Sequence, residues 1–409
     1  MVETEVQKER VILVGVSEQD GDDTKDSLEE LKELAATAGA VTEGMVIQNR
    51  ERIHPGTYVG TGKVSEIKEM LATTGATGIV CDDELSPAQM KNLEDLLDTK
   101  VMDRTLVILD IFAAHASTSE GKIQVELAQL RYSMTRLAGF GRSMSRLGGG
   151  IGTRGPGEKK LEMDKRIIRT RISQLKRELA EVKKHREVAR GQRMRNHVPV
   201  AAIVGYTNAG KSTLLNHLTH AGVLEEDKLF ATLDPTTRQL ELPGKQQILL
   251  TDTVGFIRKL PHHLIEAFKS TLEEAKYADF IIHVVDASNP QADKQMYIVY
   301  NTLRELDIRD KKIVTLFNKM DRPEADRELR DFRADHTARI SARNDRDLET
   351  VKELLAQVLR ENKTYMEHVF SYEDAGKIQV IRRQGELLSE EYTPEGIFVK
   401  AYILSLIHI

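Results

Sequence analysis

The segment Gly205–Thr213, which reads Gly-Tyr-Thr-Asn-Ala-Gly-Lys-Ser-Thr, constrains the fold of this chain more than any other stretch. It matches the pattern G-x-x-x-x-G-K-S/T, follows the apolar run Val198–Val204 and precedes the helix-like residues Leu214–Leu218. Glycines let the backbone curl so that successive N–H groups point at a phosphate, and the N-terminus of the next helix adds positive charge. A glycine-rich turn without function is the weaker interpretation, because the flanking elements also fit.

Within this loop, Lys211 is expected to reach the terminal phosphates of a nucleotide, and Ser212 is expected to hold a magnesium ion. The predicted nucleotide contacts of the loop are Gly205, Tyr206, Thr207, Asn208, Ala209, Gly210, Lys211, Ser212 and Thr213.

Composition and length set the broad class. The chain has 409 residues, which predicts two to four domains, and its 40% hydrophobic and 30% charged residues are typical of a soluble protein with a sizeable core. The acidic first residues do not resemble a signal peptide, and no apolar run is long enough to span a bilayer, so we expect a cytoplasmic monomer. Cys81 is the single cysteine, so an internal disulfide and a cysteine-based metal site are excluded. We expect Cys81 to lie in the core.

Residues 1–135 predict an N-terminal α/β domain with a largely parallel sheet, because strand-like and helix-like patterns alternate along them. Its predicted strands are Arg10–Val16, Met45–Gln48 and Gly78–Cys81, and its predicted helices are Ser27–Ala36, Lys63–Leu71 and Pro87–Leu97. Gly56–Lys63 looks like a second phosphate loop, but its spacing is wrong and Val64 replaces the magnesium-binding hydroxyl. We interpret it as a surface turn before a helix.

One long helix, Ile111–Leu137, is expected to lead into a glycine-rich basic loop at residues 136–158. This loop is either an unstructured linker or a segment that becomes ordered on RNA, with its arginines contacting phosphates and bases. The predicted RNA-binding residues are Arg136, Arg142, Arg146 and Arg154.

Residues 159–197 predict a basic helical arm. Apolar residues from Leu161 to Val182 recur at spacings of three and four, which favours a helical hairpin or coiled coil packed on the preceding helix. Between Lys165 and Arg195 there are twelve Lys and Arg residues against three Glu residues, although the whole chain has a net charge of −5. Such a charge run is often a solvated surface, but this density indicates a binding surface for nucleic acid or another polyanion.

Residues 198–363 predict a doubly wound α/β domain, and residues 364–409 a small α+β appendage. The predicted order of the appendage is strand, helix, strand, strand, and it ends in the apolar tail Leu404–Ile409. In the larger domain the predicted elements include the hairpin strands Arg238–Leu242 and Gln247–Leu250, the strands Ala278–Val285, Lys312–Phe317 and Ala338–Ile340, and the helices Pro290–Leu306 and Arg346–Leu359.

Three further motifs after the phosphate loop specify the nucleotide. Asp252-Thr253-Val254-Gly255 follows a strand, so its carboxylate can bind magnesium and the Gly255 N–H can sense the terminal phosphate. In Asn318-Lys319-Met320-Asp321, the Asp321 carboxylate can accept both N–H groups of the guanine edge, which selects guanine over adenine. Ser341-Ala342-Arg343 offers a backbone N–H to the guanine carbonyl. Together these motifs predict GTP as the ligand.

The segment Leu229–Arg238 is expected to supply the second magnesium-binding hydroxyl. Thr232, Thr236 and Thr237 all have suitable chemistry, and spacing alone does not choose among them.

The motifs taken together resemble those of the Obg–HflX group of translation-factor-related GTPases, and Gly-Gly-Ile-Gly-Thr-Arg-Gly-Pro-Gly-Glu at 149–158 resembles HflX proteins in particular. The resemblance covers almost the whole chain. It implies a GTPase that binds the large ribosomal subunit, splits or rescues ribosomes under stress, and places the glycine-rich loop near the peptidyl-transferase centre. It also implies that Thr232 is the magnesium-binding threonine.

Phe256 stands where many GTPases carry the glutamine that orients the attacking water. A phenyl ring cannot bond water, so we expect slow hydrolysis that the ribosome stimulates, with Lys211, Thr232, Gly255 and Asn208 as the catalytic residues. Asn208 gives the loop a form similar to that of potassium-activated GTPases, so K⁺ is a possible second cofactor beside Mg²⁺. The alternative for Asn208 is a loop asparagine that bonds the backbone.

Two other classes of function compete. A GTPase that acts on another structured RNA, in tRNA modification or ribosome assembly, would share most of these motifs. A non-hydrolysing RNA-binding scaffold would use GTP only as a structural ligand, and the presence of Lys211, Ser212 and Asp252 argues against it.

Overall fold

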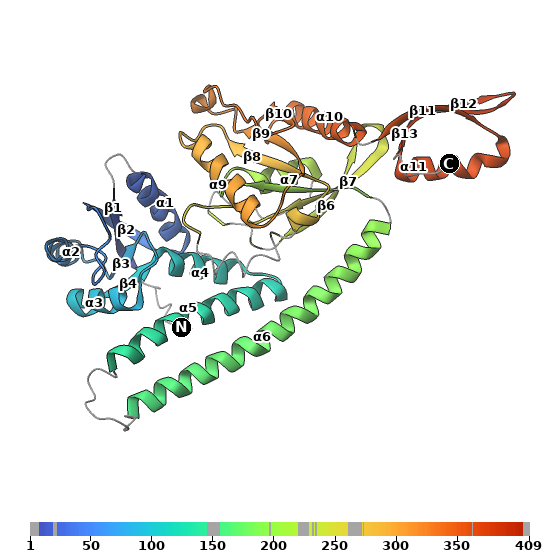
Figure 1. Ribbon diagram of the computed structural model, residues 1–409. Helices are drawn as coiled ribbons and strands as arrows, with labels where there is room; N and C mark the ends of the chain where they lie inside the picture. The colour runs from blue at the N-terminus through green and yellow to red at the C-terminus, as the bar shows by residue number, and fades with distance from the viewer. Residues whose placement is uncertain are drawn as a thin grey trace, which may run out of the picture. The chain divides into compact units, whose positions relative to one another are not determined.

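The computed structural model describes residues 8–18, 23–144, 156–195, 198–219, 229–230, 233, 235–260, 272, 274–361 and 363–403 (Figure 1). The chain divides into two compact units. The first consists of Met1–Lys183, Asp227–Asp234 and Arg258–Lys269, and the second of Lys184–Glu226, Pro235–Ile257 and Ser270–Ile409.

The first unit contains a four-stranded parallel sheet with the strand order β2-β1-β3-β4. Its elements are β1 (Arg10–Ser17), α1 (Thr24–Thr37), β2 (Val41–Asn49), α2 (Thr61–Thr74), β3 (Gly78–Cys81), α3 (Pro87–Leu97), β4 (Lys100–Asp103) and α4 (Arg104–His115). The apolar run of β1 is almost wholly buried, as expected for a central strand of a parallel sheet. The predicted α/β fold is therefore confirmed, and Cys81 lies in its core, where burial raises the pKa of the thiol.

The prediction of one helix over Ile111–Leu137 is wrong, because two helices occupy this region. The first, α4, ends at His115, and α5 (Ser119–Met144) begins after a short break. Thr118 caps the second helix, since its hydroxyl accepts a hydrogen bond of 2.9 Å from the Gly121 N–H. The apolar pattern runs through the break, so it could not reveal the cap.

The predicted helical arm is confirmed as α6 (Pro156–Arg195), a single 40-residue helix that packs along α5 (Figure 1). Leu127 of α5 and Ile172 and Leu175 of α6 are buried in the seam between the two helices. Arg171 forms a bidentate ion pair with Glu126, with N–O distances of 2.6 and 2.9 Å. The exposed side of α6 carries basic residues: Arg166, Arg169, Lys176 and Arg177.

The glycine-rich loop predicted at residues 136–158 is too long at both ends, because α5 continues to Met144 and α6 begins at Pro156. Residues 145–155, with Arg146 and Arg154, and the side chain of Arg142 lie outside the described residues. Arg136 is not in a loop at all. It lies in α5, where its guanidinium is buried, bonds the carbonyl of Leu85 and pairs with Asp103 at 2.5 Å. Its predicted role in RNA binding is therefore wrong.

The second unit contains a six-stranded sheet with the order β10-β9-β8-β5-β7-β6, in which β6 and β7 form an antiparallel hairpin and the other pairs are parallel (Figure 1). Its elements are β5 (Val200–Gly205), α7 (Lys211–Thr219), β6 (Thr236–Leu242), the 3₁₀ helix η1 (Pro243–Lys245), β7 (Gln246–Asp252), β8 (Phe280–Asp286), α9 (Ala292–Glu305), β9 (Lys312–Asn318), η2 (Pro323–Ala325), β10 (His336–Arg339) and α10 (Asp345–Glu361).

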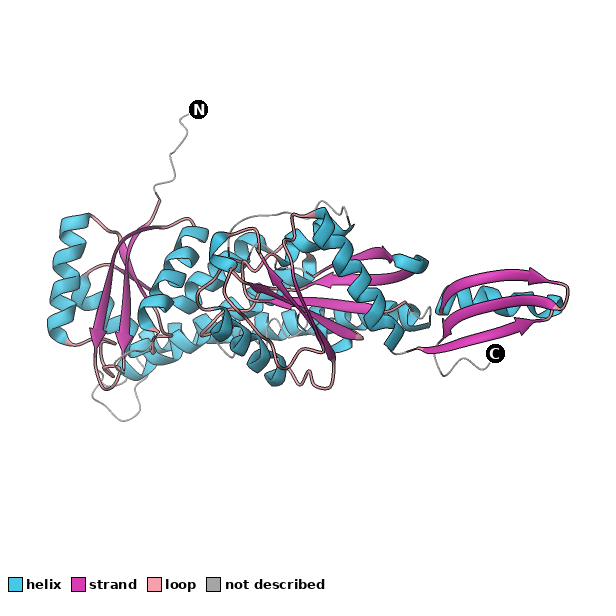
Figure 2. Ribbon diagram, turned by 90° about the horizontal axis from the view of Figure 1, so that it is seen from above, coloured by secondary structure: helices cyan, strands magenta, loops and turns pink. Residues whose placement is uncertain are grey.

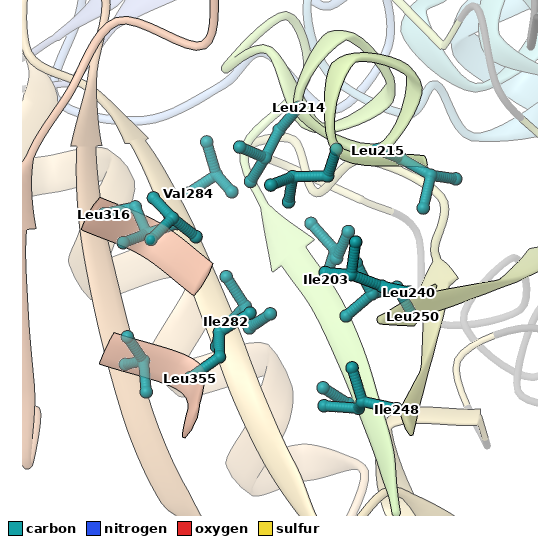
Figure 3. Close-up of a cluster of buried hydrophobic side chains, with 14 of the residues drawn as sticks. Ile203, Leu214, Leu215, Leu240, Ile248, Leu250, Ile282, Val284, Leu316 and Leu355 are labelled. Atoms are coloured by element: carbon teal, nitrogen blue, oxygen red, sulfur yellow. The ribbon is translucent and has the colours of Figure 1, made fainter. Parts of the chain in front are cut away.

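Helices cover both faces of this sheet. On one face, Leu214 and Leu215 of α7 and Leu355 of α10 pack with strand residues such as Ile203 and Ile282 (Figure 3). On the other face, α9 packs on the strands through a separate buried cluster. This arrangement confirms the predicted doubly wound fold, which brings the carboxyl ends of β5, β7, β8 and β9 to one edge of the sheet.

A buried carboxylate holds the loop that precedes β10. Asp331 accepts hydrogen bonds from the hydroxyls of Tyr300, at 2.6 Å, and Thr315, at 2.7 Å, and it lies 3.8 Å from the ring of His283. Burial alone would raise the pKa of Asp331, but its polar contacts with His283, Tyr300 and Thr315 lower it well below the usual range. This carboxylate therefore stabilises the fold in its charged form.

We expect Asp331→Asn to lower the free energy of unfolding by about 1–3 kcal/mol at pH 7, because it replaces a charged acceptor of two buried hydroxyls. Since the pKa is lowered in the folded state, this stabilisation is present in full above the unfolded pKa of about 4 and is lost progressively as the pH falls from there through the lower folded pKa. Urea unfolding at pH 7, 4 and 3 should show that the difference in the free energy of unfolding between the wild type and Asp331→Asn becomes smaller as the pH falls. The exposed control Asp326→Asn should track the wild type. A difference in stability between Asp331→Asn and the wild type that is as large at pH 3 as at pH 7 would contradict the prediction.

The C-terminal domain begins after α10 and has an antiparallel sheet with the order β11-β13-β12 (Figure 2). Its elements are β11 (Thr364–Phe370), η3 (Tyr372–Asp374), α11 (Ala375–Gln384), β12 (Glu386–Thr393) and β13 (Gly396–Ile403). This order confirms the predicted strand-helix-strand-strand appendage. The apolar tail Leu404–Ile409 lies outside the described residues.

Candidate nucleotide-binding site

The phosphate loop connects β5 to α7 at the carboxyl edge of the six-stranded sheet. A side chain at Gly205 would come within 2.3 Å of the Val284 carbonyl oxygen, so only glycine lets β5 lie this close to β8. Gly210 has a φ of +94°, and a Cβ atom there would lie 2.3 Å from the amide nitrogen of Asn318. Both positions of the motif thus require glycine because neighbouring atoms lie too close for a side chain. Gly210 is also required because its backbone has a positive φ.

Lys211 is buried at the start of α7, and its ammonium group donates a hydrogen bond of 2.8 Å to the Tyr206 carbonyl inside the loop. Burial lowers the pKa of Lys211 to about 8, although the nearby Asp252 carboxylate favours the charged form. A phosphate in the loop would supply the negative charge that this buried ammonium group needs.

Two of the three predicted magnesium ligands lie in direct contact. The Ser212 hydroxyl donates a hydrogen bond of 2.7 Å to the Asp252 carboxylate, which is fully buried at the end of β7. Hydroxyl and carboxylate oxygens are the ligands that Mg²⁺ prefers, so this pair fits a magnesium ion shared with nucleotide phosphates. Thr232, the third predicted ligand, lies outside the described residues.

The segment after Asp252 runs back along the phosphate loop. The Phe256 N–H bonds the Gly205 carbonyl at 3.0 Å, and the Thr207 N–H bonds the Phe256 carbonyl at 2.8 Å. A Cβ atom on Gly255 would lie 3.0 Å from the Lys211 ammonium nitrogen, so this glycine is beside the expected phosphate position. The Phe256 ring is 1% exposed and belongs to the core.

The remaining residues of this segment, Thr253 and Val254, are also buried. The Thr253 hydroxyl donates a hydrogen bond of 2.8 Å to the Ile203 carbonyl, which holds the segment to β5.

The guanine motif at the end of β9 is tied to the phosphate loop and to the loop after β10. The Asn318 amide donates to the Ala209 carbonyl and accepts from the Ala342 N–H, both at 2.9 Å. Lys319 donates to the Asn208 carbonyl at 2.7 Å. Asn318 and Lys319 thus bring the predicted phosphate and base loops into one site, and a guanine carbonyl would share the Ala342 N–H with Asn318.

Asp321 is exposed at the surface of the site. A hydrogen bond from Ser341 lowers the pKa of its carboxyl group, which keeps the carboxylate charged for the two N–H donors of guanine. The loop around Ser341 is itself anchored, because its N–H donates to Asp347 at 2.7 Å and its hydroxyl accepts from the Arg343 N–H at 3.4 Å.

One residue of the site was missed by the sequence analysis. Asp286, at the carboxyl end of β8, forms an ion pair of 2.7 Å with Lys319 and so orients the lysine that is predicted to cover the base. The available signal was its position, since an acidic residue directly after a buried strand of a doubly wound sheet lies at the binding edge.

The doubly wound sheet, with a phosphate loop, an Asp-x-x-Gly loop and an Asn-Lys-x-Asp loop at its carboxyl edge, defines a GTPase of the P-loop class.

Comparisons with known proteins agree with this class. Family models described as GTP-binding GTPase N-terminal, GTP-binding GTPase Middle Region and 50S ribosome-binding GTPase match residues 25–113, 115–193 and 200–319. A GTPase HflX of Lacrimispora saccharolytica is 68% identical over 405 residues, which are 99% of this chain and 96% of that protein. The corresponding protein of Caldanaerobacter subterraneus is 47% identical, over 97% of this chain and 91% of its own length. The Escherichia coli protein is 45% identical, over 76% and 73%.

The chain belongs to the HflX family of GTPases, and it hydrolyses GTP. Among the residues that the structure describes, no helix has the length and apolar character needed to cross a membrane.

Proposed function

We propose that this GTPase binds the large ribosomal subunit in the cytoplasm and splits or rescues stalled ribosomes under stress, with GTP hydrolysis stimulated by the ribosome. The observation that carries the proposal is the exposed basic side of α6, a helix that packs on α5 through a buried apolar seam. Lysine and arginine residues on such a surface contact phosphates and release counterions, which gives affinity for structured RNA. The family description 50S ribosome-binding GTPase supports the same partner.

In this proposal three sets of residues contact the nucleotide and its metal ion. Lys211 and the Gly255 N–H contact the terminal phosphate, while Ser212, Asp252 and Thr232 hold Mg²⁺. When bound, the ion neutralises phosphate charge that develops during hydrolysis. Asn318, Lys319, Asp321 and the loop Ser341–Arg343 recognise guanine.

The burial of Phe256 supports the proposal that GTP hydrolysis depends on a partner. Its ring is packed in the core, so it cannot be replaced by a water-orienting group without moving the backbone that is bonded to Gly205 and Thr207. We infer that the ribosome stimulates hydrolysis by fixing the Thr232 segment and Gly255 around the phosphates. Arg142, Arg146 and Arg154 are proposed to contact ribosomal RNA.

We further propose that K⁺ accelerates hydrolysis through Asn208, whose backbone has a φ of +59° and whose carbonyl is held by Lys319. Turnover in KCl is expected to exceed turnover in NaCl by about tenfold, and Asn208→Ala should abolish this difference, because a K⁺ ion between the phosphates would add positive charge in the transition state. Equal rates of the wild type in both salts at matched ionic strength would exclude the role of K⁺.

Sedimentation with purified large subunits tests the proposed function. The full chain should cosediment with the subunits in a nonhydrolysable GTP analogue and much less in GDP. Charge reversal at Arg166, Arg169 and Arg177 should weaken this association and leave GTP affinity unchanged, since these residues lie on α6 and outside the nucleotide loops. A lack of nucleotide-dependent association of the wild type would refute the proposal.

A further inference from the structure

The phosphate loop contains a buried hydroxyl group without a hydrogen-bond partner. Thr207 is the third residue of the loop, and its side-chain oxygen is buried and bonds no atom of the residues that the structure describes. The loop motif assigns phosphate contacts to backbone N–H groups, Lys211 and Ser212, so it gives this side chain no function. A buried, unbonded hydroxyl lowers the stability of a fold, and a ligand that accepts its hydrogen bond removes this penalty.

The Thr207 side chain lies beside the two groups that are proposed to contact the terminal phosphate. A Cβ atom on Gly255 would lie 2.8 Å from the Thr207 methyl group and 3.0 Å from the Lys211 ammonium nitrogen. Thr207 and Lys211 therefore approach the same point, and each is 6% exposed. A phosphate group that contacts the Lys211 ammonium group and the Gly255 N–H would lie next to Thr207.

The backbone contacts of Thr207 leave its hydroxyl as the group that can donate to a phosphate. The Thr207 N–H already donates a hydrogen bond of 2.8 Å to the Phe256 carbonyl. On the next residue, Lys319 bonds the Asn208 carbonyl at 2.7 Å, so the chain is fixed on both sides of the Thr207 side chain. A hydroxyl that is already held in place loses little conformational freedom when it bonds a ligand.

The position of Thr207 also indicates which phosphate it meets. In a phosphate loop, backbone N–H groups and the N-terminus of the following helix hold the inner phosphates. Gly255 belongs to the Asp-x-x-Gly loop, which senses the terminal phosphate, and the Thr207 methyl group packs on this glycine. The hydroxyl can donate a charge-assisted hydrogen bond to a phosphate oxygen there, whereas GDP has no phosphate at this position.

We propose that the Thr207 hydroxyl donates a hydrogen bond to the terminal phosphate of GTP and thereby increases the preference of the protein for GTP over GDP. This role rests on the proposed contact of Lys211 and Gly255 with the terminal phosphate, and it is independent of the proposed ribosomal partner.

Nucleotide affinities of matched variants give the first test. Thr207→Val keeps the shape of the side chain and its methyl contact with Gly255 but removes the hydroxyl. Its dissociation constant for a nonhydrolysable GTP analogue is expected to rise about tenfold, whereas that for GDP should stay within about twofold. Thr207→Ser keeps the hydroxyl and should retain the preference for the analogue. The control is Thr302→Val, which removes a hydroxyl that bonds the Ile298 carbonyl inside α9 and should leave both affinities unchanged.

Phosphorus NMR of the bound analogue identifies the phosphate. Thr207→Val should shift the resonance of the γ-phosphate and leave those of the α- and β-phosphates in place. An unaltered γ resonance, a β resonance that shifts instead, or an equal loss of affinity for GDP and the analogue would each overturn the inference. Unchanged affinity for the analogue together with slower turnover of GTP would assign the hydroxyl to the attacking water and would overturn it as well.

Urea unfolding of the full chain without nucleotide separates a ligand-binding role from a structural one. Since the structure shows no partner for the Thr207 hydroxyl among the residues it describes, Thr207→Val should unfold at the same urea concentration as the wild type or at a higher one. A lower midpoint would reveal a structural partner and would overturn the inference, with the proposed function left standing. Unchanged affinity of Lys211→Met for both nucleotides would instead overturn the proposed phosphate site and this inference together.

Discussion

Replacing Asp321 by asparagine is expected to reverse the nucleotide preference of this GTPase. In the proposed site this carboxylate would accept two N–H donors of guanine, whereas the asparagine amide would face one of them with its own NH₂ group, so GTP affinity should fall about 100-fold. Xanthine carries a carbonyl where guanine carries its amino group, and the asparagine amide can donate to that oxygen. Xanthosine triphosphate should therefore bind and be hydrolysed by Asp321→Asn better than by the wild type.

Titration with fluorescent guanine and xanthine nucleotides measures this reversal. Asp326→Asn is the matched control, because Asp326 is an exposed carboxylate in the same loop region and should leave both affinities unchanged. Unaltered GTP affinity in Asp321→Asn would show that another group recognises the base, and the assignment of the Asn318–Asp321 motif to guanine would then be wrong.

Replacing Lys211 by methionine should abolish nearly all hydrolysis. This lysine is buried in the phosphate loop, and its ammonium group is the one cation among the described residues that the loop itself holds against a phosphate position. Removing a preorganised positive charge of this kind costs about 100- to 1,000-fold in turnover. The exposed substitution Lys377→Met on α11 serves as the control, and single-turnover hydrolysis of labelled GTP is the measurement.

The same lysine predicts a pH dependence of nucleotide binding. Its pKa is lowered to about 8 in the protein without nucleotide, and bound phosphates would raise it again. Below pH 8 the lysine is largely charged in both states, whereas above pH 8 binding must take up a proton, so GDP affinity should fall about fivefold between pH 8 and 9. Lys211→Met should lack this slope. An identical slope in both proteins would show that another group titrates.

The nucleotide site could be predicted from the sequence because its motifs are local and lie at the ends of strongly apolar strands. The phosphate loop, Asp252 and the Asn318–Asp321 motif each follow a strand, and a doubly wound sheet brings those ends together without further information. Asp286 lies at the same edge, because it is the last residue of β8, but it belongs to no motif.

The remaining features depend on contacts between residues far apart in the chain. Arg136 looks like part of a basic loop, but its partners Asp103 and Leu85 come from other elements, so only the fold shows that its charge is satisfied internally. The break between α4 and α5 is a local event at Thr118 that a continuous apolar pattern conceals. The burial of the Thr207 hydroxyl likewise depends on the fold, because Gly255, on which its side chain packs, comes from a later loop.

GTP turnover with and without purified large ribosomal subunits tests the central claim most directly. Because a buried phenylalanine, Phe256, occupies the position from which a glutamine orients the attacking water in many GTPases, the protein alone should hydrolyse GTP slowly, and saturating subunits should raise turnover about tenfold or more. Lys211→Met should show no stimulation. Equal turnover with and without subunits, under conditions in which the protein sediments with them, would contradict the account.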